Sequence, residues 1–327
     1  MVSLWFLLLI IMVLGLTLVL IAAITAAFHP RSFDTVHTNT DPEVLAVLSS
    51  AQRRAWGSIA VAILILLFMT AISGSRPAAL GLPLALAPMV AATGALLFQV
   101  LPGQRAFRAS TTTVRSASLK ARSPLTYVSK PALWTPVLCT LALTGFLIFT
   151  GLTASADDFG LARSLHVETE NMGSGGGPYP GWYYGVPLLI TAAILLGITL
   201  LAQIRLSKIA AFPRTDLSDI DRTWRQGLAR IVSAISVTGP LLTLSGVTLF
   251  ASRVISSIHS SLTTHAEPAP GWLKSGPFIT LAGFACLLGA IASIVMAARW
   301  ATILKKQALA ITPLDTNQRP PRTNPYV

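Results

Sequence analysis

Long apolar runs, separated by short polar segments, dominate the chain. A helix of roughly 20 residues crosses the ~30 Å hydrocarbon layer of a bilayer. Seven runs have about this length and carry no charged residue in their central part: 4–27, 56–73, 80–101, 133–153, 184–204, 229–251 and 277–298. The pattern predicts an all-α fold, namely a polytopic integral membrane helical bundle with seven transmembrane helices.

Two polar segments carry the residues of a helix start. In Asp41-Pro42-Glu43 an Asp can cap the helix, Pro fits the first turn, and Glu faces the positive helix end. This predicts that 42–55 is a helical lead-in to the second span. Ser218-Asp219-Ile220-Asp221 has the same character and predicts a helix that begins well before the sixth apolar run.

Composition agrees with a membrane protein. Hydrophobic residues make up 53% of the 327 residues and charged residues only 11%, whereas soluble domains carry about 25% charged residues. The mean hydropathy is +0.67. Cys139 and Cys286 each lie inside an apolar run, so we interpret them as packing residues and not as a disulfide or a zinc site.

Lysine and arginine fall mainly on one side of the predicted spans. Of the 24, twenty lie in the tail and in the connections after spans one, three and five, and four lie on the other side. Cytoplasmic loops are rich in these residues, so we expect the N-terminus outside, the C-terminus cytoplasmic, and a location in the cell membrane. Basic and non-basic connections alternate along the chain only if the first apolar run, 4–27, stays in the membrane. We therefore interpret this run as a transmembrane anchor; a cleaved signal peptide is the alternative.

The net charge of +12 raises the question of nucleic acid binding. The stretch from Val44 to Ala156 contains no acidic residue, yet it includes three apolar runs. An excess of basic residues next to membrane spans is typical of contact with anionic lipids. The attraction contributes about 1 kcal/mol of binding free energy per basic residue near the surface. We therefore expect lipid contact at the basic cytoplasmic loops, above all 103–132, and no nucleic acid partner.

The segment GPYPGWYYGVP, residues 177–187, stands directly before the fifth run. Trp and Tyr prefer the headgroup level of a bilayer, so four aromatic residues are predicted to be interfacial anchors: Trp182, Tyr183, Tyr184 and Trp272. Pro187 fits the first turn of the following helix. The preceding glycines, 173–177, predict a flexible hinge.

A related segment recurs later in the chain. PGWLKSGP at 270–277 resembles PGWYYGVP at 180–187, and TGFLIFTGLT at 144–153 resembles TGPLLTLSGVT at 238–248. This indicates an internal repeat of two hairpins with parallel orientation. The predicted organisation is three basic-looped spans at 1–132, hairpin A at 133–228, hairpin B at 229–300 and a polar, Pro-rich, disordered tail at 301–327.

Motifs of enzymes are absent from the sequence: it has no GxxxxGK[ST], HExxH, CxxC or GxSxG. The span interiors offer no ionisable side chain for a proton relay. Gln99 and several prolines, among them Pro136 and Pro240, could line a cavity, although prolines are ordinary in membrane helices. Small residues at four-residue spacing predict close helix packing, within the bundle or with a partner: Ala87, Ala91, Ala95, Ala285 and Gly289.

Two predicted outer loops each contain His-x-Glu. His166 and Glu168 lie in one loop, and His265 and Glu267 lie in the other, with His259 upstream. Two imidazoles and two carboxylates could bind a divalent metal if the loops meet. Solvated loop residues are the simpler interpretation, and the sequence predicts no other cofactor.

Three functional hypotheses follow. The leading one is a non-enzymatic scaffold, sensor or complex subunit, with a membrane-protein partner or a second copy of the chain. The second is a carrier for a neutral or lipidic molecule, with a cavity near Pro136, Pro240 and Gln99. The third is an outer-face metal-dependent enzyme or metal sensor.

Overall fold

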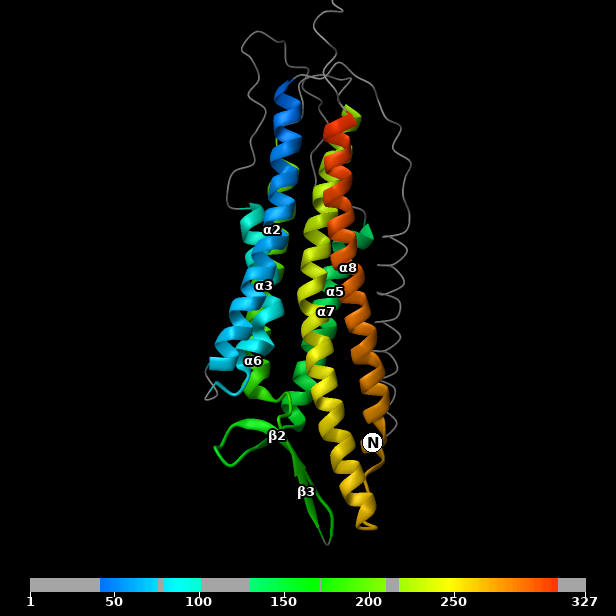
Figure 1. Ribbon diagram of the computed structural model, residues 1–327. Coiled ribbons are helices and arrows are strands. Elements are labelled where there is room, and N and C mark those ends of the chain that lie inside the picture. The colour runs from blue at the N-terminus through cyan, green and yellow to red at the C-terminus, as the bar shows by residue number, and fades with distance from the viewer. Residues whose placement is uncertain (1–41, 76–78, 101–129, 171, 210–217, 311–327) are drawn as a thin grey trace, which may run out of the picture.

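The computed structural model describes residues 42–75, 79–100, 130–170, 172–209 and 218–310 (Figure 1). Its long helices are α2 (Pro42–Ser75), α3 (Leu82–Val100), α5 (Lys130–Thr153), α6 (Trp182–Lys208), α7 (Ser218–Thr264) and α8 (Gly276–Ala310). The predicted first span, 4–27, lies outside the described residues, as do most of the 103–132 connection and residues 311–327 of the predicted tail.

Six of the predicted spans are confirmed as helices. Each of the six described helices is long and apolar enough to cross a membrane, and together they cover the second to seventh apolar runs, the third of which, 80–101, is helical from Leu82 to Val100. The predicted helix starts are also confirmed, because α2 begins at Pro42 and α7 at Ser218. The chain is therefore a multi-span helical membrane protein, and the count of seven stays a prediction.

Successive helices run in opposite directions, so the bundle has two distinct ends (Figure 1). At the sheet end, α2, α5 and α7 finish and a small β-sheet lies beside them. At the basic end, α7 begins and α3, α6 and α8 finish. Lys and Arg with described side chains gather at the basic end, which holds Arg53, Arg54, Lys130, Arg205, Lys208, Arg222, Arg225, Arg230 and Arg299. The sheet end holds Arg163, Arg253 and Lys274.

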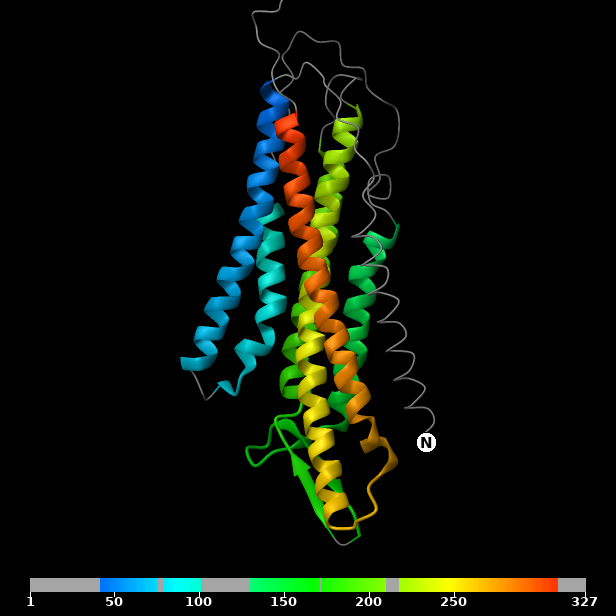
Figure 2. The ribbon, with the colours of Figure 1, turned by 45° about the vertical axis from the view of Figure 1, so that its right-hand side comes forward.

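Helix α7 is the centre of the bundle. It contacts α2, α3, α5, α6 and α8 (Figure 2), and most of its spanning part is buried. With 47 residues and a rise of 1.5 Å per residue it is about 70 Å long, roughly twice the thickness of the hydrocarbon layer. One continuous helix therefore joins the basic end to the sheet end and extends beyond the bilayer.

Small residues bring α3, α6 and α7 into close contact at Gly239. A Cβ on Gly239 would lie 2.9 Å from the Cβ of Ala92 and 3.3 Å from both Pro88 O and Leu195 Cδ2. The α3 alanines predicted to form a packing face are buried inside the chain: Ala87, Ala91 and Ala95. They pack within the bundle, so a partner that binds at Ala91 is excluded for this arrangement.

The all-α prediction is wrong for the connection between α5 and α6. This connection forms a three-stranded antiparallel sheet of β1 (Ser155–Ala156), β2 (Ala162–Glu168) and β3 (Gly173–Gly176), in the order β1-β2-β3. The predicted glycine hinge is strand β3. Its glycines permit close packing, because a Cβ on Gly175 would lie 2.5 Å from the His166 ring and one on Gly176 3.3 Å from Val254 of α7.

Both PGW motifs start helices at the sheet end. The first leads directly into α6 at Trp182, and the second enters the 3-10 helix η3 (Gly271–Ser275), which continues into α8. Pro187 is the sixth residue of α6, so the prediction that it lies in the first turn of this helix is wrong by about a turn. Sequence repetition stays a prediction, and α7 begins eleven residues before the predicted boundary of hairpin B at 229.

Large apolar side chains are exposed around the middle of the bundle. On α2 they are Ile63, Leu64, Leu67 and Phe68, and on α8 they include Leu281, Phe284, Leu288 and Ile291. In water such surfaces would be an aggregation hazard. Hydrocarbon solvates them, and the exposed faces therefore agree with a membrane location.

Candidate functional site

The predicted tyrosine anchors connect two hairpins at the sheet end. The hydroxyl of Tyr184 donates to the carbonyl of Leu80 (2.6 Å), and that of Tyr183 to the carbonyl of Ala79 (3.3 Å). Both carbonyls belong to the turn before α3. The two rings pack edge to face at 4.9 Å. The tyrosines thus fix the start of α6 to the α2–α3 turn, a role that the aromatic composition alone does not specify.

The turn between β1 and β2 is held by the carboxylate of Asp157. Its Oδ1 accepts hydrogen bonds from the N–H groups of Phe159 (3.0 Å) and Leu161 (2.8 Å), and its Oδ2 pairs with Nε of Arg163. Desolvation raises the pKa of Asp157, but the hydrogen bonds from Leu161, Arg163 and Phe159 together lower it more. The pKa therefore lies below its ordinary value.

This turn presents an exposed aromatic side chain. Phe159 is 77% exposed, and the guanidinium carbon of Arg163 lies 5.8 Å from its ring centre. The three interactions of Asp157 fix the backbone below it. An exposed aromatic ring on a preorganised turn is suited to contact with a partner, because little conformational entropy remains to be lost on binding.

Tyr179 connects the sheet to α5. Its hydroxyl lies 2.8 Å from Thr153 Oγ1, and its N–H donates to the carbonyl of Arg163 (2.7 Å). Burial raises the pKa of Tyr179 to about 12, although the hydrogen bond with Thr153 opposes the rise. The phenol is therefore neutral at physiological pH, and it joins the end of α5 to strand β2.

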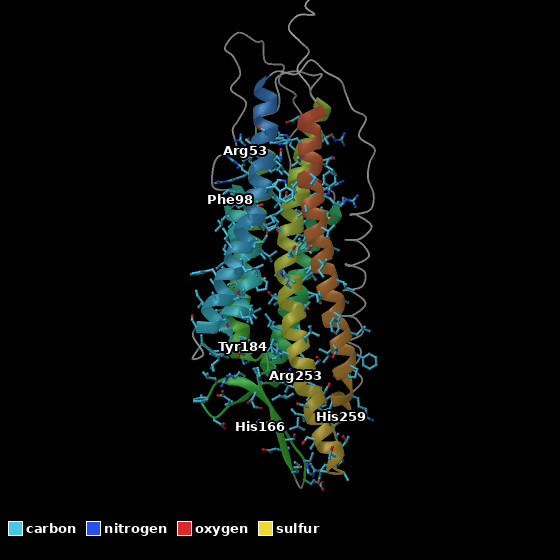
Figure 3. The ribbon with its side chains drawn as sticks, viewed as in Figure 1. Arg53, Phe98, His166, Tyr184, Arg253 and His259 are labelled. Carbon is cyan, nitrogen blue, oxygen red and sulfur yellow. The ribbon has the colours of Figure 1, made fainter. Side chains whose placement is uncertain are left out.

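The residues of the predicted metal site lie on separate elements. His166 (Figure 3) and Glu168 are exposed on β2. His265 is exposed beyond the end of α7. Glu267 follows in the loop, where its Oε2 is buried without a hydrogen-bond partner among the described residues. In the described part of the chain, no group of three or more His, Cys, Asp or Glu residues could hold a metal ion. The metal site stays a prediction.

Helix α7 ends in a Schellman motif. The N–H of Ala266 donates to the carbonyl of Thr263 (3.2 Å), and the N–H of Glu267 donates to the carbonyl of Leu262 (3.0 Å). Ala266 has a φ of 55°, a left-handed conformation in which glycine is strongly favoured over alanine.

Buried polar side chains join α6 to α7 inside the bundle. The hydroxyls of Thr199 and Ser236 lie 2.8 Å apart. Nε2 of Gln203 donates to Ser233 Oγ (3.2 Å) and to the carbonyl of Ala229 (3.3 Å). Such interhelical hydrogen bonds stabilise membrane helix packing by roughly 0.6 kcal/mol each, and they fix the register of the two helices.

One buried amide in the same region lacks partners. Gln99 of α3 is only 3% exposed, and neither Oε1 nor Nε2 has a hydrogen-bond partner among the described residues. Oε1 of Gln203 is also buried without a hydrogen-bond partner among the described residues. The sequence singles out Gln99 as a cavity residue together with Pro136 and Pro240; both prolines are buried.

Two arginines cap neighbouring helices at the basic end. Arg205 of α6 donates to the carbonyl of Val100, the last residue of α3 (3.2 Å). Arg225 of α7, fully buried, donates from Nη1 to the carbonyl of Leu206 near the end of α6 (3.1 Å) and pairs through Nε with Asp221 Oδ2 (2.9 Å). Cations at helix carboxyl ends satisfy free carbonyls and oppose the negative end of the helix dipole.

No family model, curated protein or solved structure matches this chain. Its function must therefore be argued from its own residues.

Sequence reasoning misses the roles of Asp157, Arg163 and Arg225. Asp157 and Arg163 are six residues apart, on either side of a turn that the sequence does not identify as a hairpin. The pair Asp221 and Arg225 has the i, i+4 spacing of a helical ion pair, so that signal is present in the sequence. Its burial depends on the end of α6, which residue spacing does not reveal.

Proposed function

We propose that the chain is a seven-span protein of the cell membrane whose sheet end faces outward and whose basic end faces the cytoplasm. The support is the excess of Lys and Arg at the basic end, with nine described residues there against three at the sheet end. The first apolar run, 4–27, supplies the seventh span. Basic residues of the cytoplasmic end bind anionic lipids.

We further propose that the protein is a non-enzymatic component of a membrane complex, a scaffold or sensor subunit, which binds its partner through the outer sheet. The observation that carries this proposal is the fixed turn that exposes Phe159. Around it, the sheet packs against α7 through Gly176, and α7 continues unbroken to the basic end. A contact at the sheet is thus joined by one continuous helix to the cytoplasmic face.

Site-specific photocrosslinking in living cells tests this role. A photoreactive amino acid at Phe159 is expected to give a discrete adduct with one protein, identified by mass spectrometry. The matched control is the same amino acid at Leu288, which is 61% exposed on the spanning part of α8 and should meet lipid. Asp157→Ala should weaken the adduct, because it frees the turn. If Phe159 and Leu288 give the same products, the proposed role is refuted.

A further inference from the structure

The amide of Gln99 is buried one residue before the end of α3, near the basic end of the bundle, and it has no hydrogen-bond partner among the described residues. A buried amide that forms no hydrogen bond is costly in any protein interior. Native structures normally satisfy such groups, with protein atoms or with a bound molecule. Gln99 has two open polar groups and Gln203 has a third.

Helix geometry places these two side chains at one depth. Ala92 of α3 and Leu195 of α6 both lie against Gly239 of α7, and α3 and α6 run in the same direction. Gln99 is seven residues beyond Ala92 and Gln203 eight beyond Leu195, so they lie about 10 Å and about 12 Å further toward the basic end.

Gln99 also lies on the side of α3 that faces α7. Pro88 and Ala92 contact Gly239, and positions seven residues apart share a helix face, so Gln99 continues the face of Ala92. Its neighbour Phe98 lies on a different side, against Gly57 of α2. Gln203 reaches α7 at Ser233, six residues from Gly239 and thus about 9 Å toward the basic end, close to the depth of Gln99. Helix geometry therefore directs both amides toward the same turn of α7.

The open atoms define the chemistry of what can bind. Nε2 of Gln203 is occupied by its bonds to α7, so its Oε1 is left as an acceptor. Gln99 adds one acceptor, Oε1, and one donor group, Nε2. A carboxylate or phosphate would face two acceptor oxygens and is disfavoured. Two amide oxygens also fall well short of the six to eight oxygens that Ca²⁺ takes.

We propose that Gln99 and Gln203 form a buried binding site for a small neutral molecule that donates two hydrogen bonds and accepts one. Water meets this requirement, and so does a small solute with a primary amide group or with two hydroxyl groups. The site is independent of the outer sheet and of any partner bound there. It supplies the polar element that a carrier for uncharged molecules would need.

The variant Gln99→Met distinguishes an occupied site from an empty one, because methionine is close to glutamine in size but has no amide group. If a molecule satisfies the amide, the purified full-length Gln99→Met protein should unfold at a lower temperature than the wild type. If the amide is truly unsatisfied, its removal relieves a penalty and the unfolding temperature should rise, which would overturn the proposal. The control Gln226→Met, at a half-buried position of α7, should change the unfolding temperature little.

Coupling between the two glutamines tests whether they share the bound molecule. The effect of Gln99→Met should be smaller in a Gln203→Met background, because the molecule has already lost one partner. Equal effects in both backgrounds would contradict a shared site.

Two further measurements identify the occupant. Acetamide, added as a probe, should raise the unfolding temperature saturably in the wild type and not in Gln99→Met if the site accepts solutes. If acetamide has no effect, a high-resolution structure of the wild type should show an ordered water within hydrogen-bond distance of both glutamines. Density that is empty, or filled by a side chain of the protein, would refute the proposal even if no variant can be purified.

Discussion

A pair of glycine substitutions on α7 tests the packing of the bundle. Gly239 lies at the contact of α3, α6 and α7, whereas Gly246 is seven residues further along the same helix and has nothing within 4 Å of an added Cβ. Gly239→Ala and Gly246→Ala are therefore the same chemical change on the same helix in opposite surroundings.

The magnitudes follow from the distances. Alanine in place of a helical glycine contributes about 0.5–1 kcal/mol of stability, and Gly246→Ala should gain this amount. At Gly239 the new methyl would lie 2.9 Å from Ala92 Cβ and 3.3 Å from Pro88 O, well inside the optimum of about 3.5–4.0 Å. Neither neighbour has a rotamer to change. Overpacking costs about 1–3 kcal/mol, so Gly239→Ala should be destabilising overall, by about 1 kcal/mol or more.

The assay is the free energy of unfolding of the purified variants in mixed detergent micelles. Ala92→Gly should restore much of the loss in Gly239→Ala, because it removes the closest atom. If Gly239→Ala is as stabilising as Gly246→Ala, α3 does not pack on α7 as described.

Three further predictions concern the ends of the bundle. Arg225→Met should lower the free energy of unfolding by about 3–5 kcal/mol because it leaves Asp221 buried without its partner; the exposed neighbour Arg222 is the control, and equal losses in Arg225→Met and Arg222→Met would contradict the buried pair. Ala266→Gly should stabilise by about 1 kcal/mol, measured by thermal unfolding, since the φ of 55° suits glycine; a loss of stability would exclude the motif. The lowered pKa of Asp157 means that its contribution is present above the unfolded pKa of about 3.9 and is lost as pH falls through the lower folded value. Hydrogen-exchange protection of the 157–161 turn should therefore fall in acid, and Asp157→Asn should abolish that pH dependence; an unchanged profile would contradict it.

The spans could be predicted from the sequence because hydrocarbon imposes a simple rule. A helix must be about 20 apolar residues long and keep its charges at the ends, and 133–153 and 184–204 satisfy this without any tertiary information. Polar extensions do not obey that rule. The start of α7 at Ser218 could be predicted from its acidic first turn, but its continuation from 251 to Thr264 could not.

The sheet could not be predicted from the sequence. Strand β3 is formed almost entirely of glycine, which has low strand propensity, and it is a strand through its backbone pairing with β2, which residue type does not reveal. The aromatic residues Tyr183 and Tyr184 were correctly placed at a helix end, but their partners are carbonyls about a hundred residues earlier in the chain. Contacts of this kind depend on which helices lie side by side in the bundle, and the residues around Tyr183 and Tyr184 do not reveal that arrangement.

Gln99 illustrates the remaining limit. A lone glutamine in an apolar run predicts a polar position, but only the packing of α3 on α7 shows that its amide is buried and has no hydrogen-bond partner in the described part of the chain.

The central claim is that the sheet end and the basic end lie on opposite sides of the membrane. Single cysteines at the exposed positions Glu168 and Arg222 can be treated in intact cells with a membrane-impermeant thiol reagent; the native Cys139 and Cys286 are buried and should stay unreactive. We expect Glu168→Cys to be modified in intact cells and Arg222→Cys only after permeabilisation. Modification of Arg222→Cys in intact cells would contradict it.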